Sequence, residues 1–234
     1  MTNGEHPHVV ARGTGPGVVC SHGFADDAAT FEPLLGGLGD AHRIVTWHLP
    51  GHGGAPIGPT AGTRPGALAG LEKAMAAAGP GPVTLIGHSL GGYLSLCQAV
   101  LAPAGVAGLV LMSTGPGFRD PAKRARWNER IRDYAAERGV PSAVAGMGEQ
   151  PDSVALDGLA SVSVPTLIIV GSEDRSYLRG SQLMADTMAD ATLLVVAGAG
   201  HFPHRTHTAE VTASIRNLLE RVRSSTASEA KGDT

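Results

Sequence analysis

Short apolar runs recur along the chain, and most are followed by a stretch that can form a helix. The runs are four to seven residues long and rich in Val, Ile, Leu and Thr. They lack the polar/apolar alternation of a strand with one solvated face. Strands buried on both faces have this pattern, which is typical of parallel sheets. The firm runs cover residues 17–21, 43–48, 83–87, 106–112, 166–171 and 192–197, and residues 8–11 offer a weaker one.

The segments between these runs have helical periodicity. The clearest example is residues 208–222, in which Val211, Ile215, Leu218 and Val222 follow one helical face. We expect further helices over residues 66–78, 89–101 and 182–188. Alternation of strands and helices implies right-handed crossovers, so the sequence predicts an α/β fold with a doubly wound, mostly parallel sheet.

One segment, residues 115–163, interrupts this alternation because it contains no good strand. We expect an amphipathic helix near residues 121–138, with Trp127, Ile131 and Tyr134 on one face and a basic remainder. That remainder is either a solvated surface or part of a lid over a site for anionic substrates. The predicted organisation is a core in two parts, residues 1–114 and 164–223, a reduced helical lid over residues 115–163, and a disordered polar tail over residues 224–234.

Composition excludes several classes of protein. The chain has 234 residues, which suits one domain with a small insertion, and 42% of them are hydrophobic, which suffices for a sizeable core. A net charge of -3 argues against nucleic acid or an anionic membrane as the main partner. No stretch approaches the roughly 20 apolar residues of a membrane span, and no secretion signal is evident. We therefore expect a cytoplasmic protein in which Cys20 and Cys97 are buried free thiols.

The sequence Gly87-His88-Ser89-Leu90-Gly91 matches the pattern G-x-S-x-G. The match follows an apolar run and opens a predicted helix, and a strand–Ser–helix turn is the setting of a nucleophile elbow. Such a turn lifts the serine oxygen clear of the sheet, and its glycines permit close backbone approach. The start of the helix offers N–H groups to a developing oxyanion. The setting predicts a nucleophilic serine.

A serine hydroxyl is a poor nucleophile near neutral pH, so it needs a base and a group that orients the base. Candidates for both follow two later predicted strands. Ser172-Glu173-Asp174 comes after the run at residues 166–171, and Gly200-His201 comes after the run at residues 192–197. The chain therefore carries the three residue types of a Ser-His-Asp triad on separate loops.

Taken together, these pieces resemble the α/β-hydrolase fold family, in the group that includes esterases, enol-lactonases and carbon–carbon bond hydrolases. The resemblance covers roughly residues 13–222, and its order of motifs is specific for the fold and the triad but not for the substrate. It is carried by Ser21-His22-Gly23-Phe24, Leu49-Pro50-Gly51-His52-Gly53, the elbow, Gly171-Ser172-Glu173-Asp174 and Gly200-His201.

The resemblance implies roles for five residues. Ser89 would be the nucleophile, His201 the base and Asp174 the orienting acid. The backbone N–H groups of Phe24 and Leu90 would form the oxyanion hole. An alternative stays open for the acid, because the neighbouring glutamate would take its place if the loop were one residue longer.

Further residues are assigned to the surroundings of the site. His22 and His88 lie next to the implied oxyanion region, and we count them as substrate-pocket candidates together with Trp127, Ile131 and Tyr134 of the lid. In addition, His48 stands where the family usually has an aspartate, two residues before Pro-Gly, so the geometry of that loop is expected to differ.

The activity implied by the resemblance is hydrolysis of a carboxylic ester, thioester or lactone through an acyl-enzyme. Two alternatives remain open. One is a carbon–carbon bond hydrolase of an acidic diketone, which the basic lid helix favours. The other is a serine that has lost catalysis, in a lyase, a ligand-binding protein or a biosynthetic accessory protein.

No cofactor or metal is expected. The sequence has no G-x-G-x-x-G after a strand and no Walker sequence, so nucleotide cofactors are not implied. His201, His204 and His207 are spaced by three, but Pro203 interrupts the helical spacing that metal ligands would use. The expected partner is a small carbonyl substrate. The apolar lid face could also meet a second subunit in a homodimer.

Overall fold

The computed structural model describes residues 8–38 and 41–232, with side chains as far as residue 225. Its strands form a single seven-stranded sheet in the order β1-β3-β2-β4-β5-β6-β7. β1 pairs antiparallel with β3, and all other neighbours are parallel, as the apolar runs predict. The strands are β1 (Val9–Arg12), β2 (Gly17–Ser21), β3 (Arg43–Trp47), β4 (Val83–His88), β5 (Val106–Met112), β6 (Thr166–Gly171) and β7 (Ala191–Val196).

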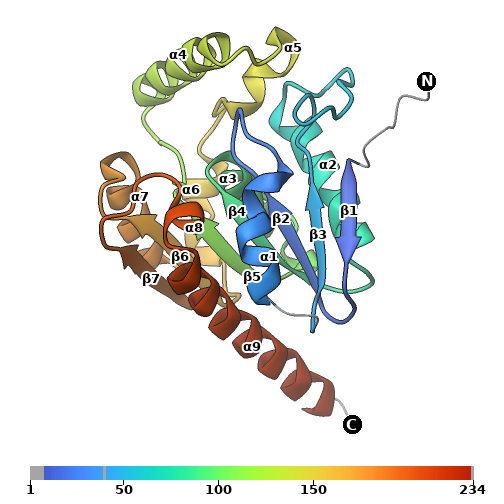
Figure 1. The fold of residues 1–234 in the computed structure, drawn as a ribbon. Helices are drawn as coiled ribbons and strands as arrows, with labels where there is room; N and C mark the ends of the chain where they lie inside the picture. Colours follow the sequence, from blue (N-terminus) through green and yellow to red (C-terminus); the bar gives the residue numbers. More distant parts are fainter. Residues whose placement is uncertain (1–7, 39–40, 233–234) are drawn as a thin grey trace, which may run out of the picture.

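Helices cover both faces of this sheet (Figure 1). One layer holds α1 (Glu32–Leu38) and α9 (Thr208–Gly232), and the other holds α2 (Arg64–Ala77), α3 (Leu90–Leu101) and α7 (Arg175–Thr187). In β2, Val18 and Cys20 join the core beneath the first layer, whereas Val19 joins the core beneath the second. Because successive residues are buried on opposite faces, the strands show no polar/apolar alternation.

The predicted lid, residues 115–163, follows β5 and contains no strand among its described residues. Its elements are α4 (Pro121–Glu137), α5 (Ser142–Ala145), α6 (Val154–Asp157) and the 3-10 turns Gly146–Gly148 and Leu159–Ser161. Asp120 caps α4 by accepting hydrogen bonds from the N–H groups of Ala122 and Lys123. Figure 1 shows α4 and α5 set apart from the sheet. Other short elements are the 3-10 turns Ala28–Phe31 and Pro103–Gly105 and the helix α8 (Pro203–Thr206).

The helices differ most from the sequence-based expectation in α1, α7 and α9. α1 was not expected, because Gly36 and Gly37 are poor helix formers, and it forms through its packing against α9. α7 begins seven residues before the expected start. α9 continues to Gly232 and so extends into the tail that the sequence predicts to be disordered, residues 224–234. The last two residues of that predicted tail lie outside the described residues.

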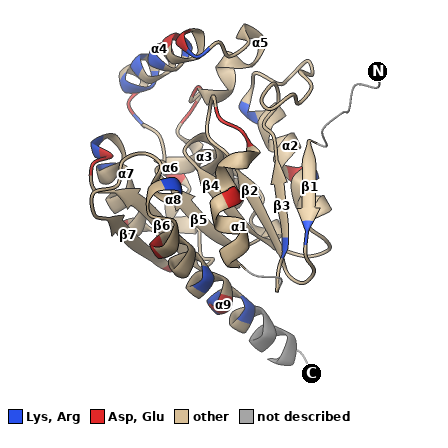
Figure 2. Cartoon of the chain, viewed as in Figure 1, with Lys and Arg blue, Asp and Glu red and all other residues tan. Residues whose placement is uncertain are grey.

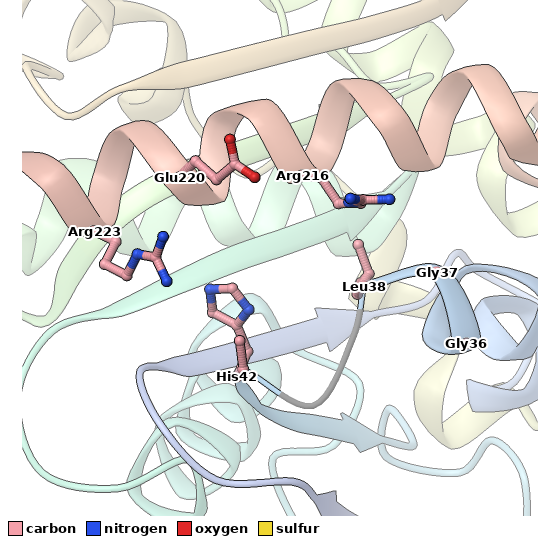
Figure 3. Close-up of a pocket in the computed structure, with 8 residues that line it drawn as sticks. Gly36, Gly37, Leu38, His42, Arg216, Glu220 and Arg223 are labelled. Carbon is pink, nitrogen blue, oxygen red and sulfur yellow. The ribbon is translucent and has the colours of Figure 1, made fainter.

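A surface hollow of about 410 Å³ lies between α1 and α9, next to the start of β3. Figure 3 shows His42, Arg216, Glu220 and Arg223 around it. Since β3 begins at Arg43, this hollow is at the amino ends of the parallel strands, and none of the site residues predicted from the sequence lines it. Among the described residues, no helix is long and apolar enough to cross a membrane.

Candidate active site

Ser89 occupies a tight turn between β4 and α3. Its backbone has φ 51° and ψ -112°, a conformation that a residue with a side chain rarely adopts. Strain of this kind costs about 1–3 kcal/mol and persists only where neighbouring contacts enforce it. Here the Ser89 N–H donates to the carbonyl oxygen of Met112 over 2.8 Å, and its carbonyl accepts from the N–H of Tyr93 over 3.0 Å. Hydrogen bonds to β5 and to α3 therefore hold the serine in the turn.

The two glycines of the motif are needed for close packing of this turn. A Cβ atom on Gly91 would overlap the carbonyl oxygen of Ser21, at the end of β2. A Cβ atom on Gly87 would overlap the backbone of Gly91. The N–H of Gly91 also donates to the carbonyl of His22 over 3.1 Å. These contacts bring the start of α3 against the loop that follows β2.

Asp174 and His201 come together at the carboxyl ends of β6 and β7. The Nδ1 atom of His201 lies 2.8 Å from Oδ2 of Asp174. Because the carboxylate accepts this hydrogen bond, Nδ1 carries the proton and Nε2 is left as an acceptor. The Asp174 side chain is 9% exposed and that of His201 is 32% exposed. The neighbouring carboxylate, Glu173, is exposed and lies outside this contact.

Within the described residues, no hydrogen bond joins Ser89 directly to His201. Tyr177, in the first turn of α7, lies beside His201. The Tyr177 ring is stacked on His201, with 5.1 Å between ring centroids and 28° between ring planes. Burial is the main reason that the pKa of Tyr177 is raised.

Tyr177 was missed at the level of the sequence, because the helix that carries it was expected to begin at residue 182. A helical stripe does run through Tyr177, Ser181, Met184 and Met188, with spacings of four, three and four residues. Gly180 weakens that signal. The glycine is tolerated because α7 passes close to the start of the lid there, where a Cβ atom would lie 3.5 Å from Pro116.

His22 and His88, both predicted as pocket residues, are 0% and 1% exposed. His22 donates from Nδ1 to the carbonyl of Gly23 over 2.7 Å and accepts at Nε2 from the N–H of Leu49 over 2.9 Å. Burial lowers the pKa of His22 to about 3. The loops enclose both rings, so neither histidine presents an exposed surface in this structure, and their place in a substrate pocket stays a prediction.

His88 supports the backbone of the proposed base. Its Nε2 atom donates to the carbonyl oxygen of His201 over 2.8 Å, and the two ring centroids are 5.0 Å apart. Its Nδ1 atom is buried without a partner among the described residues. Burial is the main reason that the pKa of His88 is well below its usual value. The His88 ring therefore stays neutral, and its hydrogen bond holds the backbone carbonyl of His201 in place.

Two further histidines hold the loop that carries Phe24. His52 accepts at Nε2 from the N–H of Ala25 over 3.2 Å and donates from Nδ1 to the carbonyl of Pro50 over 3.0 Å. His48, the residue in place of the usual aspartate, accepts at Nδ1 from the N–H of Ala28 over 3.4 Å. At position 48, the imidazole therefore provides the acceptor for a backbone N–H group.

The three lid residues predicted for the pocket differ in their contacts. Ile131 and Tyr134 are half-buried and pack on the core cluster that includes Phe24, and the ring centroids of Tyr134 and Phe24 are 6.4 Å apart. Trp127 packs within the lid itself, where its indole N–H donates to the carbonyl of Gly148 over 3.1 Å. The structure therefore brings Tyr134 and Ile131 toward the Phe24 loop.

No group of three or more His, Cys, Asp or Glu side chains suited to a metal ion occurs in the part of the chain that the structure describes. The histidines spaced by three along the sequence have separate partners. His204 is buried and pairs with the Thr30 hydroxyl over 2.8 Å, whereas His207 pairs with the Thr206 hydroxyl over 2.9 Å.

Comparison with known proteins agrees with this geometry. The family model described as "Alpha/beta hydrolase family" matches residues 18–214. The chain belongs to that family. Its described fold, with a strained serine after β4 and an Asp–His pair after β6 and β7, matches the order of motifs found in the sequence. The chain is a hydrolase of the esterase type.

Three relatives give the range of similarity. A pimeloyl-acyl-carrier-protein methyl ester esterase of Xylella fastidiosa is 27% identical, with 91% of this chain and 98% of that protein covered. A thermophilic esterase of Thermogutta terrifontis has a TM-score of 0.76 and 29% identity, covering 92% and 93% of the two chains. The enol-lactonase of Burkholderia xenovorans LB400 has a TM-score of 0.74 and 18% identity, covering 91% and 96%, and shows likeness of fold alone.

Proposed function

We propose that this protein hydrolyses a carboxylic ester through a Ser89–His201–Asp174 triad and an acyl-enzyme. The observation that carries the proposal is the 2.8 Å contact between His201 Nδ1 and Asp174 Oδ2, beside a serine held at φ 51°. The carboxylate selects the tautomer in which His201 Nε2 can accept a proton. A thioester or lactone would react by the same steps.

The mechanism follows from these positions. His201 Nε2 takes the proton of Ser89 as Oγ attacks the carbonyl carbon, and the resulting imidazolium then protonates the leaving group. A water molecule, deprotonated by His201, attacks the acyl-enzyme and releases the acid.

The oxyanion of each tetrahedral intermediate would be held by the N–H groups of Leu90 and Phe24. Leu90 is the first residue of α3, so its N–H has no acceptor within that helix. Phe24 is 9% exposed, and its loop is held by His52 through the next residue along the chain. Removing one such donor typically lowers the rate about 10²–10³-fold.

We also propose that the acyl part of the substrate carries negative charge. Figure 2 shows Lys and Arg along α4, and Lys123, Arg126 and Arg130 are exposed there. A relative of similar length is named as an esterase of an acyl group bound to a carrier protein. An anionic dicarboxylate, or an acyl chain carried by an acidic protein, fits a basic lid.

The test of the triad is hydrolysis of p-nitrophenyl esters by wild type, Ser89→Ala and His201→Ala. Both variants should lose activity while keeping the wild-type circular dichroism spectrum. Turnover by purified Ser89→Ala above about a hundredth of wild type would overturn the assignment, because residual catalysis without the nucleophile is far weaker than that in a triad enzyme.

The charge of the substrate needs a separate assay. A monomethyl dicarboxylate is compared with the methyl ester of a monocarboxylic acid of the same chain length, at low and high salt. We expect a higher kcat/KM for the anionic ester and a decrease of that preference with salt, since screening weakens exposed charge interactions. Equal kcat/KM values at low salt would refute the anionic substrate but leave the triad untouched. A lactone and a diketone in the same panel test the two related reactions.

A further inference from the structure

The loop that follows β2, residues 22–27, lies directly against the proposed nucleophile. A Cβ atom on Gly23 would be 3.3 Å from the Cβ atom of Ser89 and 2.9 Å from Nδ1 of His88. The peptide that joins Gly23 to Phe24 therefore borders Ser89, and its N–H is the proposed oxyanion donor. The position of this N–H depends on the contacts that hold the rest of the loop.

This loop contains a residue in a strained conformation. Ala25 has φ 57°, in the left-handed region that a residue with a side chain rarely adopts. Strain of this kind persists only where surrounding contacts enforce it. On one side of the loop, the N–H of Ala25 donates to Nε2 of His52. On the other side, the contact is made at the next residue, Asp26.

Asp26 forms an ion pair with Arg205. The Nη2 atom of Arg205 lies 2.6 Å from Oδ1 and 2.7 Å from Oδ2 of Asp26. The Nε atom of the same guanidinium donates over 2.9 Å to the hydroxyl of Thr30, in the 3-10 turn that follows the loop. The Asp26 side chain is 16% exposed and that of Arg205 is 41% exposed. The arginine therefore compensates a carboxylate that water reaches poorly.

Arg205 belongs to the segment that carries the proposed base. It lies in α8, soon after His201, and its N–H donates to the carbonyl of Phe202 over 3.0 Å. Its Cζ atom lies 4.6 Å from the centroid of the Phe202 ring. Figure 1 shows α8 beside α1. The ion pair therefore joins two loops that are 179 residues apart in the sequence, one with the base and one with the oxyanion donor.

Resting on the proposed triad and oxyanion hole, we propose that Asp26 and Arg205 are positioning residues. Their ion pair fixes the Phe24 N–H relative to Ser89 and His201. Neither side chain touches the reacting atoms in this proposal. The pair acts through the backbone, because it holds the residue after Ala25 and so maintains the turn that aims the Phe24 N–H. A displacement of about 1 Å at a catalytic group can lower a rate about 100-fold.

The ion pair should affect the reaction rate more than substrate binding or the stability of the fold. An oxyanion develops in both acylation and deacylation, and its donors stabilise these transition states more than the bound substrate. A partly exposed ion pair contributes little to stability. These two expectations distinguish a positioning role from general support of the fold.

Asp26→Asn and Arg205→Met are the direct tests. Asparagine keeps the size of the side chain without its charge, and methionine keeps an unbranched stem beside Phe202. We expect kcat for p-nitrophenyl esters to fall about 10- to 100-fold in each variant, at most the effect of losing the donor itself. KM should stay within about threefold and Tm within about 4 °C of wild type.

The assays are run at pH 8. Arg205 lowers the pKa of both His88 and His204, so its removal changes their titration. At pH 8 these rings are neutral with or without the arginine, because even an unperturbed histidine titrates near pH 6.5. A difference in kcat at this pH therefore does not arise from their protonation.

A trifluoromethyl ketone inhibitor reports on the oxyanion hole itself. Its carbonyl carbon bonds to Ser89 Oγ, the serine proton moves to His201, and the carbonyl oxygen becomes an oxyanion. In both variants, the inhibition constant of the ketone should rise by about the factor by which kcat/KM falls. The inhibition constant of the carboxylic acid product should stay within about threefold, whereas a generally loosened fold would weaken both inhibitors.

Two comparisons make the result specific. The double variant Asp26→Asn/Arg205→Met should be at most about twofold slower than the slower single variant, because each substitution removes the same interaction. Arg221→Met breaks another ion pair of 2.6 Å, with Asp190 at the amino end of β7, and should keep wild-type kcat within about twofold.

The outcomes separate this inference from the proposed function. If wild type hydrolyses esters and both single variants keep kcat within about threefold, the ion pair has no positioning role and the triad stands. Losses that multiply in the double variant, a rise in KM at constant kcat, or loss of the wild-type circular dichroism spectrum in both variants would likewise overturn the inference. If wild type neither hydrolyses the esters nor is labelled by a fluorophosphonate, the proposed serine chemistry fails, and the role of the ion pair fails with it.

Discussion

Three buried histidines should make the fold strongly sensitive to mild acid. His22, His88 and His204 are 0%, 1% and 0% exposed, and burial lowers the pKa of each. The pKa is about 3 for His22 and about 4 for His204. An unfolded histidine titrates near pH 6.5. The unfolded chain therefore binds more protons than the folded chain between these values, and the free energy of unfolding falls as pH falls through that window.

The size of the effect can be worked out at pH 5. A histidine with an unfolded pKa of about 6.5 that remains neutral in the fold lowers the free energy of unfolding by about 2 kcal/mol between pH 7.5 and 5. Three such histidines lower it by about 6 kcal/mol, which is comparable to the whole stability of many domains. This figure depends little on the folded pKa values, because pH 5 lies above the pKa of both His22 and His204 in the fold. Carboxylates with lowered pKa, such as Asp152 beside Arg64, act at lower pH.

Urea unfolding followed by circular dichroism at pH 7.5, 6 and 5 measures this dependence. The variant His204→Gln removes one titrating ring and retains a polar group for Thr30. Arg205 and His201 also lower the pKa of His204, and Asp26 raises it, so the comparison is made within each variant across pH. His204→Gln should lose about 2 kcal/mol less than wild type between pH 7.5 and 5. A wild-type loss below about 1 kcal/mol, or the full wild-type loss in His204→Gln, would refute the reasoning.

Four substitutions test other features of the site and of the predicted lid. Asp174→Asn should lower kcat by orders of magnitude in steady-state assays, because the His201 imidazole loses the partner that selects its tautomer. Glu173→Gln should change kcat little. The reverse order of effects would identify Glu173 as the acid. Arg64→Met removes two hydrogen bonds, of 2.6 and 2.7 Å, between the guanidinium and the carboxylate of Asp152 in the lid. The free energy of unfolding measured in urea should fall by about 2 kcal/mol. An unchanged value would mean that the ion pair contributes nothing to stability. Gly91→Ala places a Cβ atom against the end of β2 and should slow fluorophosphonate labelling and lower Tm, whereas normal labelling would show that the turn can relax.

The strands and the loops of the proposed triad could be predicted because their signals are local. The runs that form β2, β5 and β6 match the predicted bounds to the residue, since an apolar run buried on both faces is recognisable within a few positions. The order of the serine, acid and histidine motifs then places these residues at one edge of a parallel sheet. None of this requires knowledge of which helix packs on which face.

The remaining features depend on contacts between segments distant in sequence. α1 contains Gly36 and Gly37 and is stabilised by α9, more than 160 residues later. His22 and His88 look like pocket residues from their position beside the motifs, but packing encloses them. Tyr177 stacks on His201 only when α7 is placed beside the loop that follows β7. Such roles have no signature in local composition or periodicity.

The neutral histidines connect the stability of the fold to the geometry of the site. A neutral imidazole offers one donor and one acceptor, so His22 can join Gly23 to Leu49, and His52 can accept from Ala25. Protonation removes the acceptor, and each of these bridges then loses one of its hydrogen bonds. Both bridges border the loop that carries the proposed oxyanion donor Phe24. Because the pKa of His22 is about 3, its ring stays neutral in the folded protein at pH 5 and keeps both hydrogen bonds. Acid in that range should therefore destabilise the fold by protonating the unfolded chain, while the molecules that remain folded keep the His22 bridge beside the loop of Phe24.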